Sequence, residues 1–259
     1  MTRSAEEPGA PSAADRLARV LADAAGESRP RAEDDGDDPG VPVAGTAVLL
    51  RDTASGVEAL LLERPPRGSF AGAWVFPGGM VEPVDAAGGE PGDEQATARR
   101  AAVRETREEI GLDLTEETLV TLSRWEPPPG LPLRIRTWFF LAGALRTGDA
   151  EDLVLAAGEV ERARWLRLVE ALAAHGRGDL VLYPPTWVTL HGLVGAAGVR
   201  EAIEHARMAG VRRFDTVARR GPDGPILLWA EDAEFAAPGP GDRRHRLEIG
   251  RLPWRYLRA

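Results

Sequence analysis

The stretch that decides the fold is FPGGMVEPVDAAGGEPGDEQATARRAAVRETREEIGL, residues 76–112. It joins a glycine turn, Pro77-Gly-Gly79, to a segment that ends in closely spaced acidic residues. Asp93 supplies a side-chain acceptor for the free amides of a helix start, and Gly111 supplies a left-handed stop. These two signals predict a helix over residues 94–110.

Three glutamates share one face of this predicted helix. Glu105, Glu108 and Glu109 stand at i, i+3 and i+4, which places them side by side at 3.6 residues per turn. Interleaved arginines could make this an ordinary solvated face. The preceding turn favours a functional site, because glycines let the backbone approach other groups closely. Carboxylates and a backbone carbonyl are suitable ligands for a hard cation such as Mg²⁺.

These residues resemble the box of the Nudix hydrolases, G-x5-E-x7-R-E-U-x-E-E-x-G-U, where U is apolar. Residues 104–112, RETREEIGL, match its second half, with Thr106 in an apolar slot. The resemblance implies an α/β fold, a Nudix-type α/β/α sandwich with a mixed β-sheet. It also implies a hydrolase acting on phosphoric anhydride bonds, a diphosphatase of nucleoside-diphosphate derivatives.

The first half of the box departs from the family pattern. Asp85 falls where the family has glutamate, and 18 residues separate it from Arg104 where the pattern has 7. The inserted residues are rich in Gly, Pro and acid, which predicts a loop. The family's acid that braces the box arginine is therefore Asp85, Asp93 or Glu94, and the sequence leaves all three open.

An enlarged box of this kind is similar to a subgroup that includes the peroxisomal coenzyme A diphosphatases and many actinobacterial relatives. Residues 134–140, 159–165 and 183–190 share that similarity, and residues 60–74 loosely echo the coenzyme A signature of bacterial members. The resemblance favours coenzyme A or acyl-coenzyme A as substrate over ADP-ribose or another nucleotide.

The family resemblance also implies the residues of the site. Mg²⁺ or Mn²⁺ would be held by the carboxylates of the predicted helix and one turn carbonyl, which are Gly78, Glu105, Glu108 and Glu109. The general base varies in the family, so the catalytic candidates are Glu105, Glu108 and Glu159, with Glu161 as the competitor of Glu159.

Basic and small residues complete the predicted site. Arg64, which ends a predicted strand, and Arg67 could bind phosphate through bidentate hydrogen bonds, although surface arginines are common. Arg104, Gly79 and Gly111 are expected to support the box rather than to contact substrate.

Composition restricts the other partners. The 259 residues are 43% hydrophobic and carry a formal charge of −9, which disfavours binding to nucleic acid or an anionic membrane. The absence of cysteine excludes disulfides and cysteine-ligated zinc. No apolar run or leader pattern suggests membrane insertion or export, so a cytoplasmic protein is expected. Because dimers are frequent in the family, a homodimer is a further expectation.

Three regions are predicted along the chain. Residues 1–41 are an acidic, Ala- and Pro-rich segment expected to be disordered, apart from a short helix near 13–25. Residues 42–176 would form the Nudix domain. Residues 177–259 would form a C-terminal helix and β extension packed on that domain.

The apolar patterns predict the elements within these regions. In the Nudix domain we expect a hairpin, three later strands and a helix: 43–51, 57–63, 119–125, 134–144, 160–166 and 168–175. In the extension we expect a strand, one long helix and three β segments: 180–183, 186–208, 214–219, 226–229 and 246–256.

Two non-catalytic alternatives remain at this level. A Nudix fold can serve as a ligand sensor without turnover, although the intact acidic set counts against this. The chain could also be an interaction protein that uses its acidic N-terminal segment and its extension to bind a partner.

Overall fold

The computed structural model describes residues 13–26, 38, 40–68, 70–87, 90, 92–143, 153–237 and 241–259. Within them a nine-stranded mixed sheet runs in the order β8-β3-β2-β1-β6-β5-β9, while β4 pairs with β1 and β7 pairs with β2. The strands of this sheet are β1 Val43–Thr53, β2 Gly56–Glu63, β3 Ala73–Val75, β4 Gly78–Met80, β5 Val120–Glu126, β6 Arg136–Gly143, β7 Arg162–Arg167, β8 Val181–Leu182 and β9 Arg212–Asp215.

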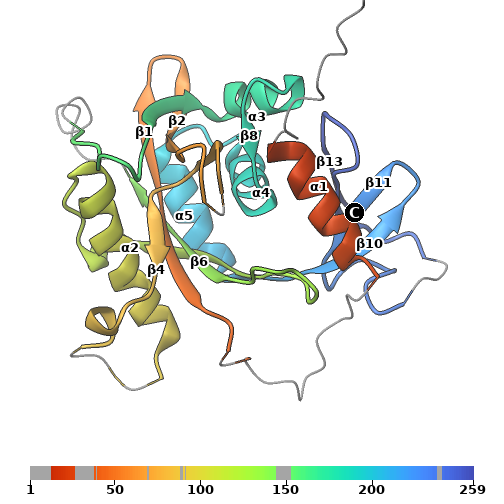
Figure 1. The fold of residues 1–259 in the computed structure, drawn as a ribbon. Coiled ribbons are helices and arrows are strands. Elements are labelled where there is room, and N and C mark those ends of the chain that lie inside the picture. Colours follow the sequence, from red (N-terminus) through yellow and green to blue (C-terminus); the bar gives the residue numbers. More distant parts are fainter. Residues whose placement is uncertain are drawn as a thin grey trace, which may run out of the picture.

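Helices cover both faces of the sheet. Helix α2 (Glu94–Ile110) lies on one face, and α3 (Leu168–Arg177), α4 (Pro184–Leu193) and α5 (Val199–Ala209) lie on the other (Figure 1). Helices can pack on both faces because consecutive side chains of β1 point to opposite sides of the sheet. Leu49 belongs to the hydrophobic cluster under α2, and Val48 belongs to the cluster on the other face. The predicted α/β/α sandwich with a mixed sheet is confirmed.

Helix α2 approaches β1 unusually closely. A Cβ atom on Gly45 of β1 would overlap the backbone of Ala98, and Ala98, Ala101 and Ala102 are fully buried. Small residues on both sides of the contact therefore set the distance between helix and sheet. Short 3₁₀ helices, η2 (Pro83–Ala86) and η3 (Glu116–Thr118), precede and follow α2.

The C-terminal extension adds a second, antiparallel sheet. Its order is β10 (Val217–Gly221), β11 (Gly224–Leu228), β12 (His245–Glu248) and β13 (Arg255–Arg258). Helix α1 (Ala13–Ala24) lies beside β10 and β11 (Figure 1). No helix in the described part of the chain has the length and apolar character needed to cross a membrane.

The disorder expected for residues 1–41 made an exception of one short helix. The short helix predicted near residues 13–25 is present, and its Leu17 and Leu21 are buried in the core. An amphipathic stripe that buries leucines is stabilised by tertiary contact, which composition does not reveal. Residues 1–12, 27–37 and 39 lie outside the described residues. The proposed division into three regions remains a prediction.

The extension also differs from the expected elements. The single helix predicted over 186–208 is two helices, because the chain turns at Gly195 (φ 99°) and Asp52 accepts a hydrogen bond from the Val199 amide where α5 begins (2.9 Å). The segment 214–219 is likewise split between β9 and β10, and 246–256 between β12 and β13.

Candidate active site

Helix α2 begins and ends where its local signals predict. The Asp93 side chain accepts a hydrogen bond from the Ala96 amide (2.9 Å), and Gly111 (φ 72°) donates its amide to the Arg107 carbonyl. The helix therefore spans Glu94–Ile110. It carries its glutamates to the glycine turn at β4.

Arg104 is the centre of the polar contacts on this helix. Its Nε and Nη2 donate to the two carboxylate oxygens of Asp85 (3.1 and 3.0 Å), and its Nη1 donates to both Glu105 (2.9 Å) and Glu108 (2.8 Å). The hydrogen bond to Asp85 is the main cause that raises the pKa of Arg104 above its usual value. Nη2 also reaches the Met80 carbonyl (3.0 Å). Of the three candidate acids, Asp85 is the one that contacts Arg104.

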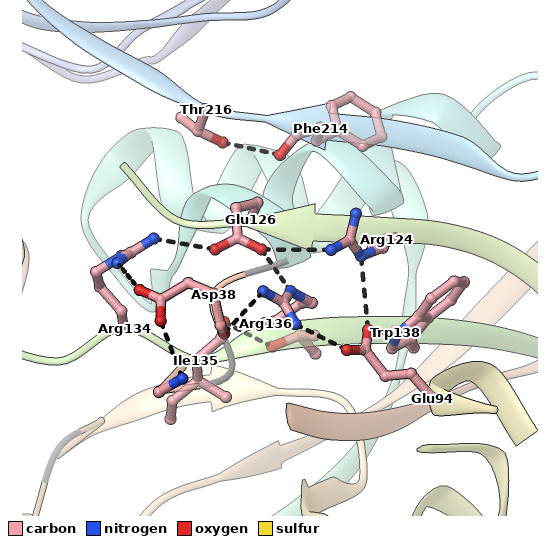
Figure 2. A network of polar contacts seen from close by, with 12 residues as sticks. Asp38, Glu94, Arg124, Glu126, Arg134, Ile135, Arg136, Trp138, Phe214 and Thr216 are labelled. Atoms are coloured by element: carbon pink, nitrogen blue, oxygen red, sulfur yellow. Dashed lines mark hydrogen bonds and ion pairs between the residues drawn. The ribbon is translucent and has the colours of Figure 1, made fainter. Parts of the chain in front are cut away.

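The other two candidate acids have different partners. Asp93 caps the helix, and Glu94 accepts hydrogen bonds from Arg136 Nη1 and Trp138 Nε1 (both 2.7 Å). Figure 2 shows Arg136 between Glu94 and Glu126, whose carboxylate lies 2.5 Å from Arg136 Nε. Arg136 is 2% exposed and Glu126 6%. This buried ion-pair network fixes the start of α2 to β5 and β6.

Glu109 is the most deeply buried of the three box glutamates. Its carboxylate accepts hydrogen bonds from Arg64 Nη1 (2.5 Å) and from the Gly78 amide (2.9 Å), and the residue is 1% exposed. Burial raises the pKa of Glu109 to about 7, against the lowering effect of these two partners. The two partners therefore hold a carboxylate whose charge is costly to bury. The structure thus places Arg64 on Glu109, and this pairing has no signal in the sequence.

The glycine turn is shaped by contacts that exclude a side chain. A Cβ atom on Gly79 would overlap the Glu105 carboxylate, and one on Gly78 would overlap the backbone of Gly45 and Thr46. Gly78 also has φ 151°, in the region that favours glycine. The turn is therefore a surface on which the Glu105 carboxylate rests. Gly78 presents its amide to Glu109; a metal-binding role for its carbonyl remains a prediction.

The loop from residue 153 to 161 lies beside the end of α2. Its Ala156 amide donates to the Glu109 carbonyl (2.9 Å), and its Glu161 amide donates to the Glu63 carbonyl of β2 (2.9 Å). Burial raises the pKa of Glu105, and the negative charge of Glu159 adds to this effect. Glu159 is thus within electrostatic reach of Glu105, and Glu161 is exposed.

Arg67 joins the same side of the site. Its Nη2 lies 3.6 Å from the position that a Cβ atom on Gly158 would take. Arg67 therefore lies beside the loop of residues 153–161, whose backbone is hydrogen-bonded to the end of α2. The roles of the predicted site residues in catalysis, metal binding and substrate binding remain predictions.

A family model described as the NUDIX domain matches residues 41–184. The chain belongs to the Nudix family. The CTP pyrophosphohydrolase of Escherichia coli (strain K12) is 33% identical over 110 residues, which cover 42% of this chain and 70% of that relative. These matches assign the chain to the Nudix hydrolases, which act on pyrophosphate bonds. The resemblance read from the box is confirmed, while the coenzyme A diphosphatase subgroup stays a prediction.

The fold comparison agrees with this assignment. The crystal structure of a Nudix hydrolase from Alicyclobacillus acidocaldarius superimposes with a TM-score of 0.55 at 24% identity. The match covers 63% of this chain and 96% of the other. The family match ends at residue 184, so most of the extension after α3 lies beyond it.

Nudix hydrolases generally use divalent metal ions, and the donor set of the site suits one. Glu105 and Glu108 share a single nitrogen of Arg104, so their carboxylates already converge on one positive charge. Carboxylate oxygens are the ligands that Mg²⁺ prefers. Among the described residues, however, no group of three or more His, Cys, Asp or Glu side chains is arranged to hold a metal.

Proposed function

We propose that this Nudix hydrolase cleaves the diphosphate linkage of a nucleoside-diphosphate derivative with the help of Mg²⁺ or Mn²⁺, and that coenzyme A or acyl-coenzyme A is its preferred substrate. The observation that carries the proposal is the set of carboxylates on α2: Glu105 and Glu108 share one nitrogen of Arg104, and Glu109 accepts a hydrogen bond from the Gly78 amide of the glycine turn. The coenzyme A preference rests on the enlarged box and on the sequence of residues 60–74.

The proposed ligands of the cation are Glu105, Glu108, Glu109 and the Gly78 carbonyl. A divalent cation, when bound, neutralises diphosphate charge and lowers the pKa of bound water. Arg104 keeps Glu105 and Glu108 beside the turn, because Asp85 holds its other nitrogens. The fixed arginine thereby restricts how far these carboxylates can move.

Glu105, Glu108 and Glu159 are the proposed acceptors of a proton from the attacking water. Burial raises the pKa of Glu105, which makes it a stronger base than an exposed carboxylate. Glu159 lies on a loop that α2 holds through backbone hydrogen bonds. Either carboxylate could therefore accept the proton without a large movement of the chain.

Arg64 and Arg67 are the proposed phosphate ligands. Arg67 is exposed on the loop that follows β2 and is the more accessible of the two. Arg64 is paired with Glu109, so it would bind phosphate only after that carboxylate takes another cation partner.

A second candidate activity is pyrophosphohydrolysis of a nucleoside triphosphate. The similarity to the CTP pyrophosphohydrolase of Escherichia coli favours this candidate. The two activities differ in the phosphate arrangement of the substrate and can be separated by their products. Coenzyme A would yield an adenosine bisphosphate and a phosphopantetheine, whereas CTP would yield CMP and pyrophosphate.

The test is product analysis with purified protein and Mg²⁺. The panel contains coenzyme A, acetyl-coenzyme A, CTP, ADP-ribose, NADH, diadenosine polyphosphates and 8-oxo-dGTP. Glu109→Gln is the test variant, and Glu117→Gln on the exposed η3 is the matched control. Turnover of coenzyme A by the wild type and the control, but not by Glu109→Gln, would support the proposal.

Two other outcomes would change the conclusion. Preferred turnover of CTP would replace coenzyme A by the second candidate. Ligand binding without turnover of any compound, in the presence of Mg²⁺, would favour the sensor or interaction protein.

A further inference from the structure

A cavity of about 310 Å³ lies between β5, α4, α5 and β9. It is on the face of the sheet opposite α2, because α4 and α5 cover that face (Figure 1). Apart from its β5 residues, its lining comes from positions 188–214, beyond the family match that ends at residue 184. The cavity is therefore a feature that the extension builds onto the Nudix sheet, separate from the box.

Small residues explain why this space is not filled. Gly192 on α4 and Ala202 and Ala206 on α5 face the cavity. Beneath them, Trp125 and Phe214 stack with their ring centroids 3.9 Å apart and their planes at 6°. A volume of roughly 300–1,000 Å³ is typical of sites for small organic molecules. Both rings belong to the lining of the cavity and supply apolar surface to it.

The cavity wall is mixed, with a polar surface almost as large as its apolar surface. Ser123 (2% exposed) and Thr189 (7% exposed) are buried in its wall, and the Ser123 hydroxyl oxygen accepts a hydrogen bond from Trp125 Nε1 (3.1 Å). That hydroxyl can still donate its own hydrogen. A wall that combines apolar side chains with buried hydroxyls suits a ligand with an apolar body and a polar end.

Arg212 supplies the positive charge at the cavity. It is exposed, and its Nη1 lies 3.5 Å from the position that a Cβ atom on Gly192 would take. His205, also in the lining, is paired with Glu201 (3.6 Å). Within the described part of the chain, Arg212 forms no ion pair with a carboxylate. Its planar guanidinium is therefore available to an external anion.

We propose that this cavity binds a small monocarboxylate with a flat or branched apolar body. The carboxylate accepts two parallel hydrogen bonds from Arg212, the geometry in which guanidinium and carboxylate match. The apolar body lies on Trp125 and Phe214. A phosphate-rich ligand fits less well, because the remaining walls would leave its other charges without partners.

Ligand-observed NMR titration of the full chain tests this proposal. The probes are benzoate, phenylacetate and 4-methylpentanoate, each compared with its neutral amide, without added metal or nucleotide. Arg212→Gln removes the proposed anion contact. Arg213→Gln is the matched control, because consecutive residues of a strand point to opposite sides and Arg213 does not line the cavity.

Gly192→Leu is a second, independent variant that fills the cavity. Among the described residues outside the helix itself, the atom within 4 Å of a Cβ at this helical position is Arg212 Nη1, at 3.5 Å. Leucine is also a better helix former than glycine by roughly 1 kcal/mol, so the variant should fold. Thermal unfolding of each variant verifies that loss of binding is not loss of structure.

The site would be supported if the wild type and Arg213→Gln bind at least one acid. Arg212→Gln should then bind that acid about tenfold or more weakly, and Gly192→Leu should not bind it. Any of three results would overturn it: no acid binds the wild type up to its solubility limit, acid and amide bind equally, or Arg212→Gln binds like the wild type. Because the readout requires no hydrolysis, its failure is distinguishable from failure of the proposed function.

Discussion

Asp85→Asn tests the contact on which the arrangement of the box depends. The Asp85 side chain is 3% exposed and accepts two hydrogen bonds from Arg104 and one from the Glu82 amide (2.8 Å). Asparagine preserves the shape but has one acceptor oxygen, so a guanidinium N–H would face the amide NH₂. The variant therefore breaks a charged pair without creating a cavity.

The magnitude follows from the burial of the pair. Hydrogen bonds to charged groups contribute about 1.5–3 kcal/mol, and removing one partner of a buried ion pair costs about 3–5 kcal/mol. Arg104 is 17% exposed and keeps Glu105 and Glu108 as partners. We therefore expect the free energy of unfolding to fall by about 2–3 kcal/mol, below the full cost of an isolated buried charge.

Equilibrium urea unfolding of Asp85→Asn and Asp93→Asn measures this difference. Asparagine caps helices as well as aspartate does, and Asp93 is exposed, so the second variant should lie within about 0.5 kcal/mol of the wild type. Hydrolysis by Asp85→Asn should also fall, because Glu105 and Glu108 lose the fixed position of Arg104. Equal stability of the two variants would refute the assignment of Asp85 as the bracing acid.

Three further predictions concern the turn, a buried histidine and the ion-pair network. Gly79→Ala should lower kcat about tenfold or more with a small change in Tm, because the new Cβ displaces only the flexible end of Glu105. Gly78→Ala should instead lower the free energy of unfolding by at least about 2 kcal/mol, because its Cβ would overlap the backbone of β1 and Gly78 has a positive φ. Parallel kinetics and thermal unfolding separate the two, and equal behaviour would contradict the contact. Burial lowers the pKa of His175 from 6.5 to about 4, so the unfolded chain binds a proton that the folded chain excludes. Stability contributed by neutral His175 is then complete above pH 6.5 and is lost as pH falls toward 4, by about 1.4 kcal/mol per pH unit. Urea unfolding at several pH values should show a shallower acid slope for His175→Gln, and an unchanged slope would count against this burial effect. Arg136→Met should lower the free energy of unfolding by about 3 kcal/mol in urea, because it removes a principal partner of the buried Glu126 and of the partly buried Glu94. A loss below about 1 kcal/mol would show that the neighbouring arginines compensate.

The sequence by itself determined the helix of the box and the class of fold. Asp93 and Gly111 predicted the bounds of α2, because capping involves only residues within one turn of the helix end. The two apolar runs, 43–51 and 57–63, with the turn residues 52–56 between them, predicted the hairpin, in which Thr53 and Gly56 are paired in register. The family pattern of residues 104–112 predicted the sandwich before any contact was visible.

Only the tertiary structure decided which charged groups meet. In the sequence, Asp85, Asp93 and Glu94 were equivalent candidate partners of Arg104. In the structure Asp85 binds Arg104, Asp93 caps α2, and Glu94 binds Arg136. These contacts depend on how η2 and β6 lie against α2. The pairing of Arg64 with Glu109 joins residues 45 positions apart. Such long-range contacts follow from packing, and a linear pattern does not encode them.

In the extension too, the sequence determined the local elements and the tertiary structure determined how they pack. Its apolar runs predicted helix and strands, but the break between α4 and α5, the second sheet and the burial of α1 depend on contacts between distant segments. The cavity at Arg212 exists because small residues of α4 and α5 meet over Trp125 and Phe214. Local sequence signals fix where elements begin and end, since those interactions are short in range. Packing decides which faces meet, which side chains become buried, and therefore where the sites lie.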